Sequence, residues 1–260
     1  DRSLVYFCQD QPEHVTNLAF LMGCYAVLCH HVHPENLPFL KASRQDSASP
    51  FLPFRDASYT ASVFDLRVQD CLRGVAKARD LGFFNMNTFD ASEYARLDDP
   101  DVADMHQICD KLYAFRGPAA VPRDPWTHSP MHFVQLLHSK GVTTVVRLNG
   151  PEIYDRQVFL RAGFNHYDIH IQDSGEIDMP AIQRFMHICD ETDGPVAVHC
   201  GCGLGRTGTM IALYLMRTYE MSASEALGWL RIVRPGSVIG RQQLLLQEME
   251  FADWNALEFE

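Results

Sequence analysis

Apolar residues recur at helical spacing in two stretches near the start of the chain. Residues 13–32 and residues 63–82 place an apolar side chain every three or four positions, so they predict two helices that face a core. The intervening residues 43–53 contain Ser, Asp and two prolines and predict a loop. Asp90 precedes a short helical pattern that Pro100 ends, which predicts a capped connector helix.

Beyond residue 110 the pattern changes to short apolar runs that alternate with helical stretches. The runs predict strands at 112–115, 142–148, 167–171 and 195–199, and the stretches predict helices at 129–140, 151–161, 178–192, 206–219, 222–233 and 240–253. Such alternation is typical of an α/β domain with a central sheet flanked by helices.

Residues 196–209 read VAVHCGCGLGRTGT, an apolar strand followed by a glycine-rich turn and a helix. Gly201, Gly203 and Gly205 let consecutive amides point inward as an anion-binding nest. The helix that begins near Arg206 directs its positive dipole end at the same point. We therefore expect Cys200 to be a thiolate at neutral pH and Arg206 to grip two phosphate oxygens.

This segment is predicted to be a phosphate-binding loop with a built-in nucleophile, formed by Cys200, Gly201, Cys202, Gly203, Leu204, Gly205 and Arg206. Two other interpretations exist. A cysteine after a buried strand is usually an inert apolar residue, and residues 203–208 also have the spacing of a dinucleotide loop. A dinucleotide loop needs neither this cysteine nor an arginine among its glycines, so the pattern favours cysteine-dependent phosphate chemistry.

Composition excludes several function classes. The chain has 260 residues, of which 47% are apolar, and its apolar runs are too short or too interrupted for a membrane span. Eight cysteines without CxxC pairs fit reduced intracellular thiols, and twelve histidines form no ligand motif, so we expect no metal and no cofactor. The first residues show no initiator Met or signal peptide, and we expect a piece of a longer protein.

The charge balance bears on partners. A net charge of −11, from 22 basic and 33 acidic residues, argues against nucleic acid as a substrate and favours basic partners.

The spacing His-Cys, five residues, Arg in residues 199–206 matches the signature of the protein tyrosine phosphatase superfamily. Four further segments resemble those of the mitotic-exit dual-specificity phosphatases, the cell-division-cycle-fourteen family: PFLPFRDAS (50–58), GVTTVVRLN (141–149), AGFNHYDIHIQD (162–173) and WLRIVRPGSVIGRQQ (229–243). The resemblance covers nearly the whole chain.

The resemblance implies two tandem phosphatase-like domains. We expect a truncated and degenerate first domain at 1–88, a connector helix at 89–106 and a catalytic domain at 107–260. Residues 4–8 and the following helix mimic the strand and helix around Cys200, but His14 stands where an arginine would be needed. Cys8 is therefore expected to be structural.

The resemblance also implies the remaining catalytic parts. Asp173, in the loop of residues 171–175, is the expected general acid, with Glu176 and Asp178 as rivals. Gln242, with Gln243 second, is expected to position the water that attacks the phosphoenzyme. Thr207 is expected to donate to the departing sulfur, and His199 to brace the loop.

Substrate preference follows the resemblance less closely. The family acts mainly on phosphoserine before proline, with a basic residue further along. Asp98 matches one carboxylate of the acidic peptide groove, but Ala95 stands at another, which weakens the expected basic preference. Gly201 and Cys202 replace the family's usual Lys and Ala, which argues against phosphoinositides. Cys202 also suggests trapping of an oxidised Cys200 as a disulfide, although a small apolar wall is the simpler interpretation.

The sequence thus predicts a dual-specificity protein phosphatase that acts on phosphoproteins through a phosphocysteine. A phosphopeptide-binding scaffold with little turnover is the alternative, and a phosphoinositide or RNA-end phosphatase is disfavoured. By resemblance we expect an intracellular location in cytoplasm or nucleus, extending to centrosome, spindle or cilium. The oligomeric state is not predicted.

Overall fold

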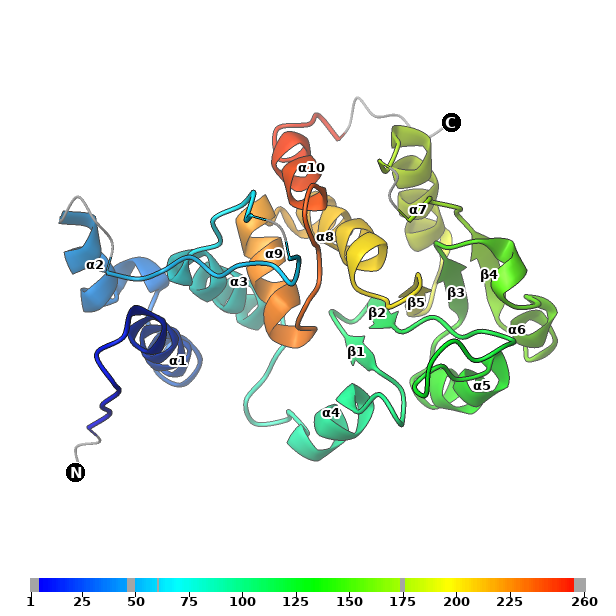
Figure 1. Cartoon of the computed structure of the whole chain (residues 1–260), viewed down its shortest axis with the longest axis horizontal. Coiled ribbons are helices and arrows are strands. Elements are labelled where there is room, and N and C mark those ends of the chain that lie inside the picture. Colours follow the sequence, from blue (N-terminus) through cyan, green and yellow to red (C-terminus); the bar gives the residue numbers. More distant parts are fainter. Residues whose placement is uncertain (1–4, 46–49, 60, 174–175, 255–260) are drawn as a thin grey trace.

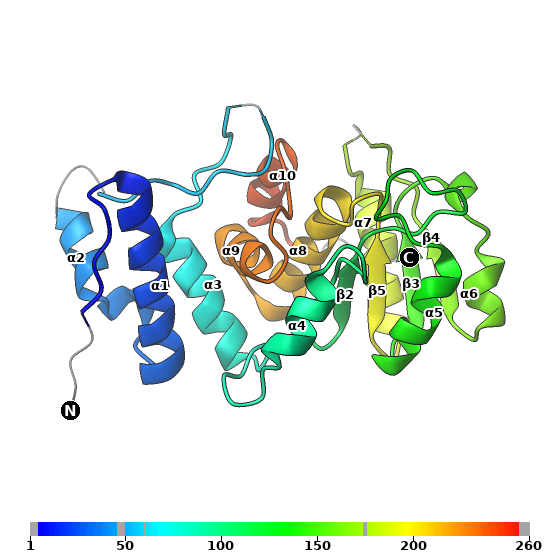
Figure 2. The same ribbon diagram turned by 60° about the horizontal axis from the view of Figure 1, so that its bottom comes forward.

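The computed structural model describes residues 5–45, 50–59, 61–173 and 176–254 (Figure 1). A helical region at one end of the molecule packs beside a larger region built around a sheet (Figures 1 and 2). Among these residues, no helix combines the length and the apolar character needed to cross a bilayer.

The N-terminal region consists of helices with one shared core. They are α1 (Pro12–His30), the short 3₁₀ helix η1 (Pro34–Asn36), α2 (Pro38–Gln45) and α3 (Val68–Asp80). Val27, Leu40 and Leu72 lie at its centre and are almost fully buried. The sequence predicted α1 well, but α3 begins later than expected, and α2 extends into residues that were predicted as loop.

The chain before α1 differs from the prediction. Residues 5–8 form no strand; Val5 and Phe7 are exposed, and so is Cys8. Among the described residues this apolar run therefore does not form the buried strand that would mimic the one before Cys200, and the structural role of Cys8 stays a prediction. Leu4, the first residue of that run, lies outside the described residues.

Helix α4 (Ala91–Asp98) follows, and Asp90 caps it by accepting hydrogen bonds from the amides of Ser92 and Glu93 at 3.0 and 2.9 Å. The helix ends before the predicted limit of the connector. The chain then enters a strand that the sequence did not predict, β1 (Met105–Gln107).

Five strands form the sheet, in the order β1-β2-β5-β3-β4. The other four strands are β2 (Leu112–Phe115), β3 (Thr144–Arg147), β4 (Asn165–Asp168) and β5 (Val196–His199). All neighbours are parallel except β1, which pairs antiparallel with β2. The central strand β5 is buried along its whole length.

Helices cover both faces of the sheet (Figures 1 and 2). Val196 and Val198 of β5 belong to the core shared with α7 (Met179–Glu191), α8 (Gly205–Tyr219) and α9 (Ala223–Val233), whereas Ala197 belongs to the core shared with α5 (Pro130–Ser139) and α6 (Gln157–Arg161). This alternation follows from the two-residue period of a strand. Helix α10 (Gln242–Met249) packs on α8.

Two predicted elements in this region were wrong in extent. Residues 151–161 form a 3₁₀ turn, η2 (Pro151–Ile153), and then the short helix α6, because Tyr154 leaves the helical conformation with extended backbone angles. β4 ends at Asp168, so the predicted strand at 167–171 extends past it, although the amides of Ile169 and Ile171 still donate to the carbonyls of Arg147 and Leu148 at 2.9 and 3.0 Å.

Helices α3 and α9 join the two regions, and glycines allow their close approach. A Cβ at Gly74 would lie 2.5 Å from the carbonyl oxygen of Glu225, and one at Gly228 would lie 2.8 Å from the Cα of Cys71. Any larger residue would separate the two backbones. The N-terminal region is therefore packed directly onto the helix that follows α8.

Candidate functional site

The glycine-rich loop (residues 200–206) connects the carboxyl end of β5 to the start of α8. Ligands bind at this edge of parallel sheets. The Cys200 side chain is buried, and the residue is 4% exposed. The amide of Gly117, which follows β2, donates to the Gly201 carbonyl at 2.9 Å. The loop is thus held from the neighbouring strand as well as from its own helix.

Arg234, which directly follows α9, binds backbone carbonyls of the glycine-rich loop. Its Nε donates to the carbonyl of Gly203 at 2.7 Å, and one Nη donates to the carbonyl of Cys202 at 3.0 Å. Its other Nη lies 2.8 Å from Oδ1 of Asp104. Because Arg234 binds the carbonyl oxygens of two consecutive residues, it fixes the peptide planes on which an anion-binding nest depends.

Gly203 is needed for steric reasons. Its φ is +68°, and a Cβ at this position would lie 2.0 Å from the carbonyl oxygen of Phe115. The loop passes so close to the end of β2 that no side chain fits there.

Arg206 and Asp173 meet in front of this loop. One Nη of Arg206 donates to the carbonyl of Ile171 at 2.7 Å, and the other contacts Oδ1 of Asp173 at 2.5 Å. Arg206 is buried, while the Asp173 side chain is 92% exposed. The structure therefore brings together the arginine and the aspartate that the sequence predicted.

The rivals for Asp173 are less well placed. Asp178 caps α7, since its Oδ1 accepts the amide of Ala181 at 3.0 Å. Glu176 is exposed and follows Ser174 and Gly175, which lie outside the described residues. Asp173 is therefore the carboxylate that the structure places at Arg206.

His199 is fully buried behind Cys200. Its Nδ1 donates to the Cys200 carbonyl at 3.0 Å, and its Nε2 lies 2.7 Å from the hydroxyl of Tyr154, which also lies 2.8 Å from Nε2 of His166. Burial lowers the pKa of His199 to about 3, so the ring is neutral. A neutral, doubly bonded ring fits the predicted bracing role.

A buried arginine supports this histidine pair. Nε of Arg147 lies 2.6 Å from Asp168, its Nη1 donates to the Tyr154 carbonyl at 2.7 Å, and its guanidinium carbon lies 4.3 Å from the centre of the Tyr154 ring. Arg147 thus contacts both the backbone and one face of the ring of Tyr154, whose hydroxyl lies within hydrogen-bond distance of His199.

The two candidate glutamines separate clearly. Gln242 is half-buried, and its Oε1 would lie 3.0 Å from a Cβ at Gly205, so it borders the glycine-rich loop. Gln243 is fully buried, and its Nε2 donates to Asp56 at 2.9 Å. Gln243 was therefore wrong as a second water-positioning candidate, because its amide is already bound in the interior.

The predicted contact of Thr207 with sulfur is absent among the described residues. The Thr207 hydroxyl is buried there without a hydrogen-bond partner. Its expected role stays a prediction.

Asp98 lies at the end of α4, and its side chain is 54% exposed. Its Oδ1 lies 3.1 Å from Nε2 of His106, and burial lowers the pKa of that histidine to about 4. Arg96, next to Ala95, is held by Glu93 at 2.7 Å. His106 is therefore neutral and does not compensate the charge of the Asp98 carboxylate.

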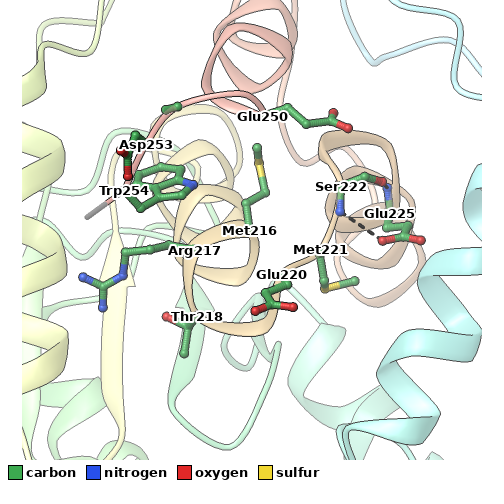
Figure 3. Close-up of a pocket in the computed structure, with 11 residues that line it drawn as sticks. Met216, Arg217, Thr218, Glu220, Met221, Ser222, Glu225, Glu250, Asp253 and Trp254 are labelled. Atoms are coloured by element: carbon green, nitrogen blue, oxygen red, sulfur yellow. Dashed lines mark hydrogen bonds between the residues drawn. The ribbon is translucent and has the colours of Figure 1, made fainter. Parts of the chain in front are cut away.

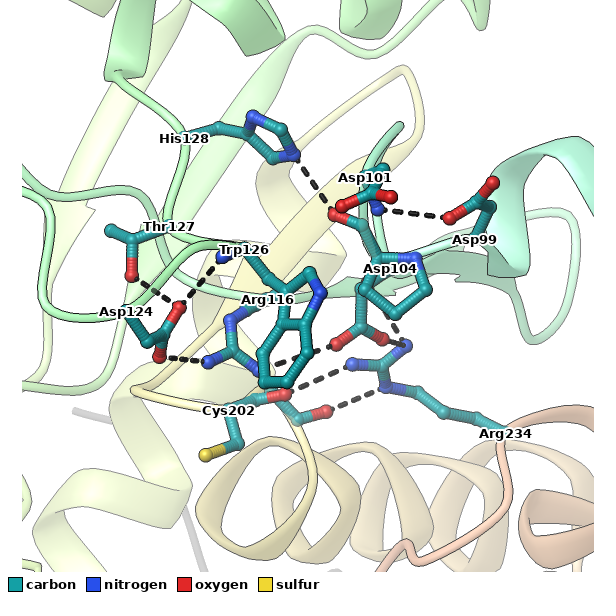
Figure 4. A network of polar contacts seen from close by, with 12 residues as sticks. Asp99, Asp101, Asp104, Arg116, Asp124, Trp126, Thr127, His128, Cys202 and Arg234 are labelled. Atoms are coloured by element: carbon teal, nitrogen blue, oxygen red, sulfur yellow. Dashed lines mark hydrogen bonds and ion pairs between the residues drawn. The ribbon is translucent and has the colours of Figure 1, made fainter.

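The segment of residues 116–128, which follows β2, lies beside the glycine-rich loop (Figure 4). Arg116 forms an ion pair with Asp124 and lies 3.8 Å from Asp104, and Asp124 also accepts the amide of Trp126 at 3.0 Å. Trp126 is 46% exposed. Arg116 thus connects this segment to Asp104, the same residue that forms an ion pair with Arg234.

A pocket of about 810 Å³ lies elsewhere, between the end of α8, the start of α9 and residues 250–254 (Figure 3). It is at the opposite end of α8 from the glycine-rich loop, about 20 Å away along a 15-residue helix. Its lining includes none of the predicted catalytic residues Cys200, Arg206 and Asp173. Within the described ranges, no group of three or more His, Cys, Asp or Glu is placed to hold a metal ion.

Sequence reasoning missed Arg234, Tyr154 and Asp56. Arg234 and Asp56 lie inside segments that carried the family resemblance, so those segments pointed to the right regions without giving the roles. Tyr154 had no signal, since it lies in residues that were predicted as helix.

Comparisons with known proteins match both regions. Residues 127–244 match the family model described as Swiss Army Knife protein, DSP-PTPase phosphatase domain. Residues 1–78 match the model described as dual specificity protein phosphatase, N-terminal half. The predicted boundaries at 88 and 106 stay predictions.

Three relatives match almost the whole chain. Dual specificity protein phosphatase CDC14AB of Danio rerio is 40% identical over 97% of this chain and 42% of its own length. Dual specificity protein phosphatase CDC14A of Homo sapiens is 40% identical over 96% of this chain and 42% of its own length. Tyrosine-protein phosphatase cdc-14 of Caenorhabditis elegans is 36% identical over 98% of this chain and 37% of its own length. The chain spans less than half the length of these relatives. With both family models matched in order, the chain belongs to the CDC14 family of dual specificity protein phosphatases.

Proposed function

We propose that this chain hydrolyses phosphate monoesters of phosphoproteins, at serine, threonine and tyrosine, through a phosphocysteine at Cys200. One observation supports this most directly: Asp173 lies 2.5 Å from Arg206, at the end of a loop that begins at Cys200 and whose Cys202 and Gly203 carbonyls are held by Arg234.

In the first step the Cys200 sulfur attacks phosphorus, and the bond from phosphorus to the substrate oxygen breaks. Asp173 gives its proton to that oxygen. In the second step a water beside Gln242 attacks the phosphocysteine, Asp173 takes a proton from it, and the sulfur leaves. The products are the dephosphorylated protein and inorganic phosphate.

The ion pair between Arg206 and Asp173 fits a site that awaits its substrate. A phosphate dianion competes with Asp173 for one Nη of Arg206, while the other Nη stays bound to the Ile171 carbonyl. Binding thus releases the exposed aspartate, which takes up a proton from water and then gives it to the leaving oxygen.

Substrate selection is proposed to favour phosphoserine before proline, by resemblance to the family. We propose only a weak preference for a basic residue further along. Asp98 remains as an exposed carboxylate, but Arg116 and Arg234 compensate Asp104, and position 95 lacks a carboxylate. An intracellular site of action, in cytoplasm or nucleus, is proposed on the same resemblance.

Hydrolysis of p-nitrophenyl phosphate tests the proposal. Cys200→Ser is expected to abolish phosphate release, and Asp173→Asn to slow it by about 10²–10⁴-fold because the leaving oxygen then lacks its acid. Asp65→Asn, at an exposed position in another segment, is the control and keeps the rate. A Cys200→Ser variant with undiminished turnover contradicts the mechanism. A wild type that binds phosphopeptide without turnover supports the scaffold instead.

A further inference from the structure

The segment that follows α9 and includes the first residues of α10 (residues 236–243) is under backbone strain. Gly236, Val238 and Gly240 all have positive φ, at +87°, +58° and +55°. For a β-branched residue such as Val238 this conformation is strongly unfavourable, and it persists only where the surroundings enforce it. The segment includes Gln242, which borders the glycine-rich loop.

The N-terminal region holds this segment in place through Asp56. Oδ2 of Asp56 accepts the amide of Gly240 at 2.5 Å and Nε2 of Gln243 at 2.9 Å. Asp56 is 8% exposed, and its own segment is fixed because the amide of Phe54 donates to the Leu66 carbonyl at 2.7 Å. One carboxylate oxygen thus holds both ends of the turn that leads into α10.

Arg231 of α9 completes the arrangement. It donates to the carbonyl of Val238 at 2.9 Å and to Oε1 of Gln243 at 2.7 Å. Burial alone would raise the pKa of Asp56, but hydrogen bonds from Ser58 and Gly240 and the charge of Arg231 hold it below the usual value. Asp56 is therefore a carboxylate, and Gln243 links it to the arginine.

From these contacts we infer that Asp56 is a positioning residue for the second chemical step: it fixes the 236–243 segment so that Gln242 faces the glycine-rich loop and orients the attacking water. The inference rests on the proposed function. It gives the catalytically degenerate N-terminal region a direct part in turnover, separate from substrate selection. Asp56 itself does not touch the reacting atoms.

Rapid-mixing kinetics with p-nitrophenyl phosphate separate the two steps. Asp56→Asn keeps the size and shape of Asp56 but removes its charge and one acceptor oxygen. We expect it to keep the rate of the p-nitrophenol burst within about twofold and to lower the steady-state rate tenfold or more. Gln242→Ala should give the same pattern. Asp65→Asn, exposed in the same N-terminal region, is the matched control and should change neither phase.

A double variant makes the test specific. If Asp56 acts through Gln242, Asp56→Asn combined with Gln242→Ala is no slower in steady state than Gln242→Ala alone. A double variant whose steady-state rate falls by the product of the two single effects contradicts the inference. So does an Asp56→Asn variant whose burst rate and steady-state rate fall equally. If Asp56→Asn does not fold, Gln243→Ala breaks the same contact from the other side and must show the same split. A wild type without turnover contradicts the proposed function instead.

Discussion

Arg234 is the residue on which the shape of the glycine-rich loop depends most directly. Its guanidinium is almost fully buried and binds the carbonyls of Cys202 and Gly203 together with Asp104. A planar fork can satisfy three partners in fixed directions, which a single ammonium group cannot do. In the proposed mechanism, catalysis depends on a residue that does not touch the substrate.

Arg234→Lys should therefore lower kcat by about 10²-fold, the cost of misplacing donors in an anion-stabilising site. Steady-state hydrolysis of p-nitrophenyl phosphate measures this. Arg184→Lys, at an exposed position of α7, is the control. An unchanged kcat in Arg234→Lys would show that the loop keeps its shape without the fork.

At the scale of elements, the loop is confined between two strand ends and a helix start. β5 delivers Cys200, the end of β2 presses against Gly203, and α8 begins at Gly205 with its dipole directed at the loop. The close approach of β2 makes the glycine at position 203 a geometric requirement.

Gly203→Ala and Gly141→Ala form a matched pair, because both glycines have φ of +68°. Each substitution carries a similar backbone cost of about 1–2 kcal/mol. At Gly141 nothing lies within 4 Å of the added Cβ, whereas at Gly203 it would lie 2.0 Å from a carbonyl oxygen. We expect Gly141→Ala to lower the free energy of unfolding modestly and keep kcat, and Gly203→Ala to lose nearly all activity. Equal activity of the two variants would disprove the steric argument.

At the scale of the whole molecule, three buried histidines make folding depend on pH. Burial lowers the pKa of His106 and His166 to about 4 and that of His199 to about 3. The unfolded chain binds protons at these rings near pH 6.5, and the folded chain does not. Stability is therefore full above about pH 6.5 and is lost as the pH falls toward the folded values.

Urea unfolding between about pH 7.5 and 5 should show this loss, with a slope that approaches about 1.4 kcal/mol per pH unit for each histidine. Most carboxylates stay ionised in this window. His106→Gln should make the slope shallower, while His187→Gln, exposed on α7, should not. A free energy of unfolding that is constant over the window would contradict neutral buried rings.

The sequence predicted the strands and helices whose pattern is locally determined. β2 was predicted at its observed bounds, and Arg206 contacts Asp173, two residues that the sequence assigned to one site. β1 was missed because three residues at a sheet edge give no periodic signal, and β4 was displaced because its outward face is polar. Contacts such as Asp56 with Gln243 join residues distant in the chain, so no local pattern reveals them.

The proposed mechanism requires a covalent phosphoryl group on Cys200, and trapping that group tests the mechanism without relying on rates. The wild type is mixed with p-nitrophenyl phosphate, quenched within the burst into alkaline denaturant, and digested for peptide mass spectrometry. We expect one added phosphoryl group, on the sulfur of Cys200 in the peptide that contains this residue, and none after Cys200→Ser. Steady turnover with no phosphoryl group on that peptide would contradict the mechanism.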